Sequence, residues 1–76
     1  MPYINIKCYP KDEETKKKVV ERINDTFLEL WGCAPEAISI SLEEIQPQNW
    51  DEVIQNEIRP NSDKMFILSG EKRYNE

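Results

Sequence analysis

Apolar and polar residues alternate at the beginning of the chain. Between residues 2 and 9 every second position is small or apolar, namely Ile4, Ile6 and Cys8. The positions between them carry Tyr3, Asn5 and Lys7. A period of two predicts a β-strand with one covered face. Pro2 has the parity of the isoleucines, so we expect its ring at the end of the covered face.

A helical pattern follows the first strand. Asp12 is a suitable N-cap, and Glu13 and Glu14 are in the first turn, where the helix dipole favours negative charge. Apolar residues then recur with helical spacing up to a stop at Gly32, and they are Val19, Val20, Ile23, Phe27, Leu30 and Trp31. This stripe predicts a long amphipathic helix whose apolar side belongs to the core.

Strict alternation returns in residues 38–43, after a turn at residues 35–37. The order of strand, helix and strand predicts a βαβ unit with parallel strands. The fold class is therefore α/β, a single βαβ unit followed by a short C-terminal helical segment. Two strands are not a stable sheet in water, so we expect oligomerisation to complete it.

The last thirty residues carry weaker signals. The sequence Asn49-Trp50-Asp51-Glu52 resembles a capping box that opens a short helix, which Pro60 interrupts. Residues 65–68 are compatible with a helical turn or a short strand, and the helical turn is favoured. The charged tail 71–76 is expected to pack only against a partner subunit. Residues 1–76 are predicted to form one domain.

Composition excludes several classes of function. The chain has 76 residues, a net charge of -5, two cysteines and no histidine. An acidic chain does not suit nucleic acid, and the run of residues 16–18, all lysines, is interpreted as a solvated helix face. Without histidine, neither a His-activated nucleophile nor a zinc site is expected. No apolar leader or membrane segment is visible, so the reducing cytoplasm is the expected location.

Pro2 is the candidate catalytic group. Methionine aminopeptidase normally removes an initiator methionine that precedes a small residue, which would leave Pro2 with a free secondary amine. An α-amino group has a pKa of about 7.7–8.0 in peptides, and burial lowers the pKa of a cationic acid. A desolvated Pro2 amine could therefore act as a neutral base near pH 7.

The chain resembles the 4-oxalocrotonate tautomerase family, and within it the bacterial phenylpyruvate-type tautomerases. The resemblance rests on a set of short matches in order: Pro2, Ile4, Ile6-Lys7-Cys8, Pro10-Lys11, Ser39-Ile40-Ser41, Gln46-Pro47, Trp50, Glu57-Ile58 and Pro60. It implies keto–enol isomerisation of a small-molecule substrate without a cofactor or a metal, with Pro2 as general base and acid.

The resemblance also implies substrate-binding positions. Family members that act on dicarboxylates have an arginine after the first strand and another in the second strand, where this chain has Asp12 and Ser39. Lys11 is the nearest replacement for the first arginine, Ser39 offers one neutral hydrogen bond, and Trp50 matches an aromatic pocket wall. This combination favours a 2-oxo monocarboxylate with an apolar tail, such as phenylpyruvate.

Two functions remain open from the sequence. One is a cytoplasmic tautomerase that depends on Pro2, and the other is a catalytically weak, homo-oligomeric metabolite-binding domain with the tautomerase fold. In both cases we expect a homo-oligomer. A dimer is favoured over a hexamer because the outward positions of both strands are polar.

Overall fold

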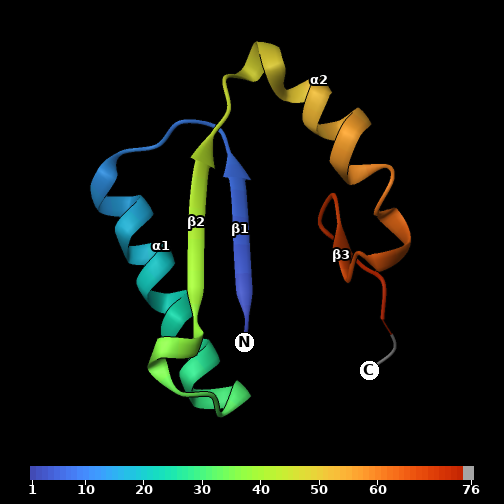
Figure 1. Ribbon diagram of the computed structural model, residues 1–76. Coiled ribbons are helices and arrows are strands. Elements are labelled where there is room, and N and C mark those ends of the chain that lie inside the picture. Colours follow the sequence, from blue (N-terminus) through green and yellow to red (C-terminus); the bar gives the residue numbers. More distant parts are fainter. Residues whose placement is uncertain (75–76) are drawn as a thin grey trace. The chain divides into compact units, whose positions relative to one another are not determined.

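The two alternating segments form a parallel pair of strands, β1 (Tyr3–Cys8) and β2 (Ser39–Glu44), as predicted (Figure 1). The structure is a computed structural model, and it describes residues 1–74. The register runs from Tyr3 opposite Ser39 to Cys8 opposite Glu44. Helix α1 (Glu13–Thr26) connects the strands and confirms the βαβ unit.

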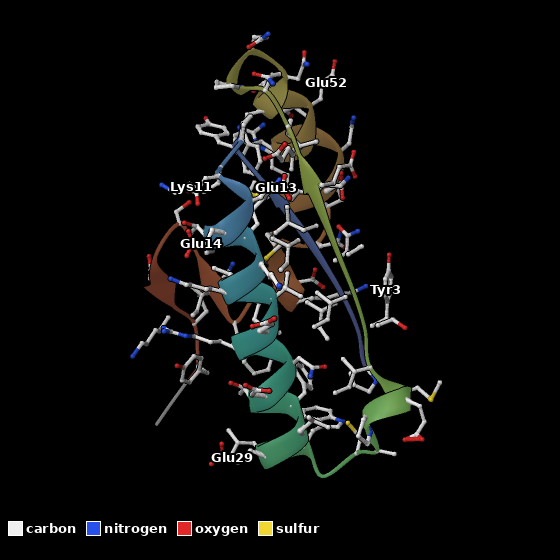
Figure 2. The ribbon with its side chains drawn as sticks, turned by 90° about the vertical axis from the view of Figure 1, so that its left-hand side faces the viewer. Tyr3, Lys11, Glu13, Glu14, Glu29 and Glu52 are labelled. Atoms are coloured by element: carbon white, nitrogen blue, oxygen red, sulfur yellow. The ribbon has the colours of Figure 1, made fainter. Side chains whose placement is uncertain are left out.

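The sheet has one covered face and one open face. Ile4, Ile6 and Cys8 of β1 are half-buried on the side of α1. The side chain of Tyr3 points away from α1 and is 71% exposed (Figure 2). On the open face the Asn5 amide donates a hydrogen bond of 2.8 Å to the Ser41 hydroxyl. Alternation in the sequence therefore gives the right orientation of the strand.

Helix α1 begins and ends where the sequence predicts. The Asp12 carboxylate caps it by accepting a 2.9 Å hydrogen bond from the Thr15 N–H. The helix continues as a π-helical turn, Phe27–Trp31, and ends at Gly32, which has a φ of 72° that glycine adopts without steric cost.

The prediction that the whole apolar stripe of residues 19–31 belongs to the core is wrong at Val19, which is exposed, and at the end of the stripe. Leu30 is 79% exposed and Trp31 is 68% exposed, although the Trp31 ring lies 5.4 Å from that of Phe27. One helix above two strands has too little surface to cover both flanks of the stripe. The single chain therefore leaves a large apolar surface in contact with solvent.

The second segment contains the predicted short helix. A 3-10 turn, Pro47–Asn49, leads into α2 (Trp50–Val53), which continues as a π-helical turn, Ile54–Ile58. The predicted capping box is wrong, because Asn49 makes no side-chain capping hydrogen bond. Its φ of -103° and ψ of 1° differ from the extended conformation of an N-cap, since the preceding turn already enters the helix.

A hairpin replaces the helical turn that was favoured for residues 65–68. Strands β3 (Ile67–Leu68) and β4 (Glu71–Lys72) pair antiparallel across Ser69 and Gly70. Both turn residues have a positive φ, 49° and 82°, as a tight hairpin turn requires. The predicted tail 71–76 thus begins inside this hairpin, and its residues 75–76 lie outside the described residues.

By their contacts the described residues fall into two compact units, Met1–Gln46 and a second that begins at Pro47. That residues 1–76 form one domain stays a prediction. Cys8 and Cys33 are free and half-buried. Among residues 1–74 no helix is both long enough and apolar enough to cross a membrane.

Candidate active site

Pro2 lies directly before β1 and is held there by the sheet. Its carbonyl accepts a 3.1 Å hydrogen bond from the N–H of Ser39, the first residue of β2. The Pro2 side chain is half-buried and has the parity of the face that α1 covers. The parallel ladder thus extends to Pro2 and limits the movement of a group whose nitrogen becomes an amine only when Met1 is removed.

Ser39 is a backbone neighbour of Pro2, but their side chains diverge. Ser39 is paired with Tyr3, and side chains opposite each other in a sheet point to the same face. The exposed Ser39 side chain therefore shares the open face with Tyr3, whereas Pro2 belongs to the covered face. The structure brings Pro2 together with the Ser39 N–H and not with its hydroxyl.

Lys11 lies at the opposite end of β1 from Pro2. The strand between them has six residues, and a strand of that length spans roughly 20 Å. Figure 2 shows Lys11 near the beginning of α1 and Tyr3 at the far end of the strand. A small substrate cannot contact Pro2 and Lys11 of the same protomer at once.

An apolar hollow of about 240 Å³ adjoins Lys11. The side chains that line it include Ile6, Cys8, Val19 and Leu42, all from β1, α1 and β2. An aliphatic or aromatic group could be buried there, with a negative charge near the lysine. This end of the sheet is therefore suited to an amphipathic anion.

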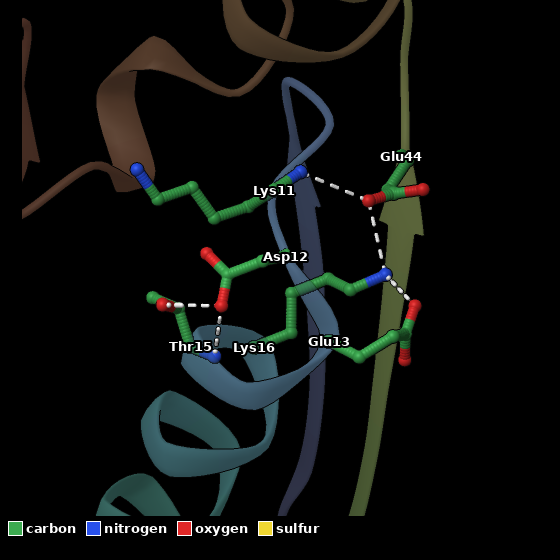
Figure 3. A network of polar contacts seen from close by, with 6 residues as sticks. All are labelled: Lys11, Asp12, Glu13, Thr15, Lys16 and Glu44. Carbon is green, nitrogen blue, oxygen red and sulfur yellow. Dashed lines mark hydrogen bonds and ion pairs between the residues drawn. The ribbon is translucent and has the colours of Figure 1, made fainter.

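A network of polar contacts surrounds the backbone of Lys11 (Figure 3). The Glu44 Oε2 atom accepts hydrogen bonds from the Lys11 N–H and from the Lys16 Nζ atom, each 3.0 Å long. Lys16 Nζ also donates to Glu13 Oε1 at 2.6 Å. The Lys11 N–H, followed by Lys16, lowers the pKa of Glu44, and Glu13, followed by Glu44, raises the pKa of Lys16.

Asp12 stands where the family resemblance implies an arginine in members that act on dicarboxylates, and its carboxylate is part of the helix cap. Its Oδ2 atom accepts from the backbone N–H of Thr15 at 2.9 Å and from the Thr15 hydroxyl at 2.8 Å. These two hydrogen bonds, the backbone one first, lower the pKa of Asp12. Asp12 is therefore an anion whose hydrogen bonds cap the helix, and it cannot bind a substrate carboxylate.

Trp50 belongs to the second unit. It is the first residue of α2 and is half-buried. Its role as an aromatic wall of the pocket stays a prediction, because Trp50 and Pro2 lie in different units.

Sequence reasoning missed Glu44 and misread Lys16. The interpretation of residues 16–18 as a solvated face fits Lys17 and Lys18, which are exposed, but the Lys16 side chain is only 16% exposed. A signal existed for Lys16, since Glu13 stands three residues before it on the same helix face. The partnership with Glu44 joins positions 28 residues apart, and no local pattern predicts it.

Comparison with known proteins identifies the family. Residues 2–51 match the family model described as "Tautomerase enzyme", and the match begins at Pro2. The chain is 36% identical over 72 residues to Tautomerase PptA of Escherichia coli O127:H6, covering 92% of this chain and 96% of the relative. It is 34% identical over the same length and shares of each chain to Tautomerase PptA of Shigella sonnei. The chain therefore belongs to the tautomerase family of enzymes.

Proposed function

We propose that the protein is a keto–enol tautomerase of 2-oxo monocarboxylates such as phenylpyruvate, and that Pro2, exposed by removal of Met1, transfers the proton. One observation carries the proposal. Pro2 is the first residue of the family match, and the Ser39 N–H holds it at the end of the covered face of the sheet. It is the distinctive proton-transfer group of a chain that has no histidine.

The reaction needs a single group that accepts and returns a proton. The neutral Pro2 amine takes the proton of the 2-hydroxyl group of the enol. The C2–O bond becomes a carbonyl, the C2–C3 double bond becomes single, and the prolinium returns the proton to C3. The amine must be unprotonated at the start, and partial burial favours that state by destabilising the cation.

The substrate carboxylate is assigned to Lys11 of another protomer. The separation of roughly 20 Å along β1 excludes a shared site within one chain. Assembly is also expected from the core, because Val53, with 8% exposure, is the one buried residue among residues 1–74. We favour a dimer, in which two equivalent sites each combine Pro2 of one chain with Lys11 of its partner.

Ser39 and Trp50 complete the proposed site. Ser39 holds Pro2 through its backbone hydrogen bond to the Pro2 carbonyl, and Trp50 supplies an apolar wall for the tail of the substrate. A second substrate carboxylate would lack a partner, since Asp12 is an anion held in the helix cap. The proposal therefore concerns monocarboxylates rather than dicarboxylates.

The test is to block the amine. A variant with an N-terminal extension that cannot be cleaved is compared with the mature protein and with a control that carries the same extension at its C-terminus. Intact mass verifies the termini, light scattering verifies assembly, and the ultraviolet absorbance of phenylenolpyruvate reports turnover. Loss of a general base should lower kcat/KM by at least about 100-fold.

Equal rates for the blocked and mature proteins would refute the role of Pro2. A mature protein that binds phenylpyruvate but leaves enol decay at the rate of the buffer would instead support the alternative function, a metabolite-binding domain. The C-terminal control separates both outcomes from a general effect of the extension on folding.

A further inference from the structure

The backbone of Lys11 is fixed to the sheet by a side chain of the other strand. Glu44 is the last residue of β2, and its Oε2 atom accepts the 3.0 Å hydrogen bond from the Lys11 N–H. Figure 3 shows the Lys11 side chain directed away from Glu44, so that the carboxylate holds the base of the lysine and not its ammonium group. The ammonium group of Lys11 therefore points away from this carboxylate.

The residue that follows Lys11 is fixed as well. Asp12 caps α1 through Thr15, and the Asp12 carbonyl accepts a 3.1 Å hydrogen bond from the Lys16 N–H. At the strand end, the Ile45 N–H donates to the Cys8 carbonyl at 2.7 Å. The backbone of Lys11 is therefore fixed at the end of the sheet, and only its side chain is flexible. This limits the volume that the Lys11 ammonium group explores.

Lys16 offsets part of the charge of Glu44, because its ammonium group also binds Glu13. An unpaired carboxylate beside the backbone of Lys11 would repel an incoming substrate anion. The Lys16 Nζ atom lies 3.0 Å from Glu44 Oε2, and its side chain is largely covered. Glu44 can thus accept the Lys11 N–H while Lys16 offsets part of its negative charge.

We propose that Glu44, paired with Lys16, is a positioning residue that orients Lys11 toward the carboxylate of the substrate. This inference rests on the role of Lys11 in the proposed function. Glu44 contacts no reacting atom and acts through the backbone of Lys11. By holding the Lys11 backbone, Glu44 reduces the conformational freedom that Lys11 loses when the substrate binds. The substrate carboxylate is therefore bound more tightly.

The experiment compares an anionic and a neutral substrate. Phenylenolpyruvate carries the carboxylate, whereas the enol of its methyl ester undergoes the same isomerisation without the charge. Glu44→Ala should raise KM for the acid roughly 2- to 10-fold, the range for freeing one ordered side chain, with kcat little changed. KM for the ester should stay the same.

Two further variants separate the parts of the network. Glu44→Gln keeps an oxygen that can accept the Lys11 N–H, so it should restore most of the lost affinity. Glu14→Ala is the matched control, because it removes a carboxylate that is 81% exposed and pairs with Lys18 on the same helix. It should change neither KM.

The outcomes distinguish this inference from the proposed function. If Lys11→Ala leaves KM for the acid unchanged, the proposed role of Lys11 fails. If Lys11→Ala raises KM for the acid and Glu44→Ala does not, Glu44 has no positioning role. If Glu44→Ala impairs the acid and the ester equally, or impairs the acid further in the Lys11→Ala background, Glu44 serves the fold alone and the inference is overturned.

Discussion

The two ends of the β1–β2 sheet differ in their chemical environment. At the end where the strands begin, a backbone hydrogen bond from Ser39 holds Pro2 on the covered face. At the end where the strands finish, Lys16 and Glu44 form an ion pair beside Lys11. A neutral amine is favoured by an apolar setting, because a nearby anion would raise its pKa, whereas binding of a carboxylate requires a cation.

The difference explains why one protomer is insufficient for the proposed reaction. Roughly 20 Å of strand separates the charged network from Pro2 of the same protomer. The same distance keeps Lys11 away from the substrate of its own Pro2. Assembly would bring the end of one sheet that suits proton transfer to the end of another that suits anion binding.

Mixing two defective chains tests this separation and should give the largest effect. One chain carries the N-terminal block and an intact Lys11, and the other carries Lys11→Ala and a free Pro2. A random mixture of dimers should recover roughly a quarter of the unmodified sites, because half of the dimers are mixed and each has one intact site. Enol decay under subsaturating substrate measures the recovery.

A control mixture reverses the arrangement by combining the unmodified chain with a chain that carries both changes. If each site is shared between protomers, this mixture also retains about a quarter of its sites, but if Pro2 and Lys11 of one chain act together it retains about half. The single-chain arrangement also predicts no recovery in the first mixture. If the control mixture retains about half of its sites and the first mixture shows no recovery, Pro2 and Lys11 of one chain act together. The proposed separation of the two functions between the ends of the sheet would then be wrong.

Much of this geometry could be predicted from the sequence. Alternation identified both strands, and the parity of Pro2 identified its face, because a residue of a strand has only two sides on which to place its side chain. The separation of Pro2 from Lys11 was also readable, since both flank the same strand.

Other features depend on contacts that no local pattern encodes. The residues before Ser69 and Gly70 are too few for their periodicity to separate a strand from a helical turn, and the positive φ of both turn residues decides the hairpin. Leu30 and Trp31 continue the helical stripe, but a periodic pattern does not say whether the covering layer is the same chain or another. Glu44 gave no signal, because its partners are distant in sequence.

Substrate choice offers a smaller test of the difference between the ends. Because Lys16 is paired with Glu13 and Glu44, Lys11 is the cation assigned to the substrate, and phenylenolpyruvate should be processed with a higher kcat/KM than the dicarboxylate 2-hydroxymuconate. Trp50→Ala should lower kcat/KM for the aromatic substrate by about 2- to 10-fold, the range expected for an aromatic contact. The difference in kcat/KM between the two substrates should therefore become smaller. Trp50→Phe, which keeps a ring, is the control.

Side-by-side kinetics on the two enols measure this prediction. If the unmodified enzyme processes the dicarboxylate equally well or better, a further cation must serve the site, and Arg59 or Arg73 of a neighbouring subunit would be the next candidates. An equal loss for both substrates in Trp50→Ala would assign Trp50 to the fold or to the subunit interface.

The smallest expected effect concerns stability at the charged end. The pKa of Glu44 is lowered below its ordinary 4.5, so its contribution is present above that value and is lost as the pH falls through the lowered pKa. The pKa of Lys16 is raised above its ordinary 10.5, so its contribution is present below that value and is lost as the pH rises through the raised pKa. Both groups therefore stabilise the fold between these limits.

Lys16→Met should lower Tm at pH 7, and this loss should shrink as the pH falls through the lowered pKa of Glu44. Lys18→Met removes the same charge from an ion pair that is longer, at 3.6 Å, and more exposed, so its effect on Tm at pH 7 should be smaller. Equal losses for the two variants at pH 7 would mean that the network around Glu44 holds the end of the sheet no more firmly than an ordinary surface ion pair.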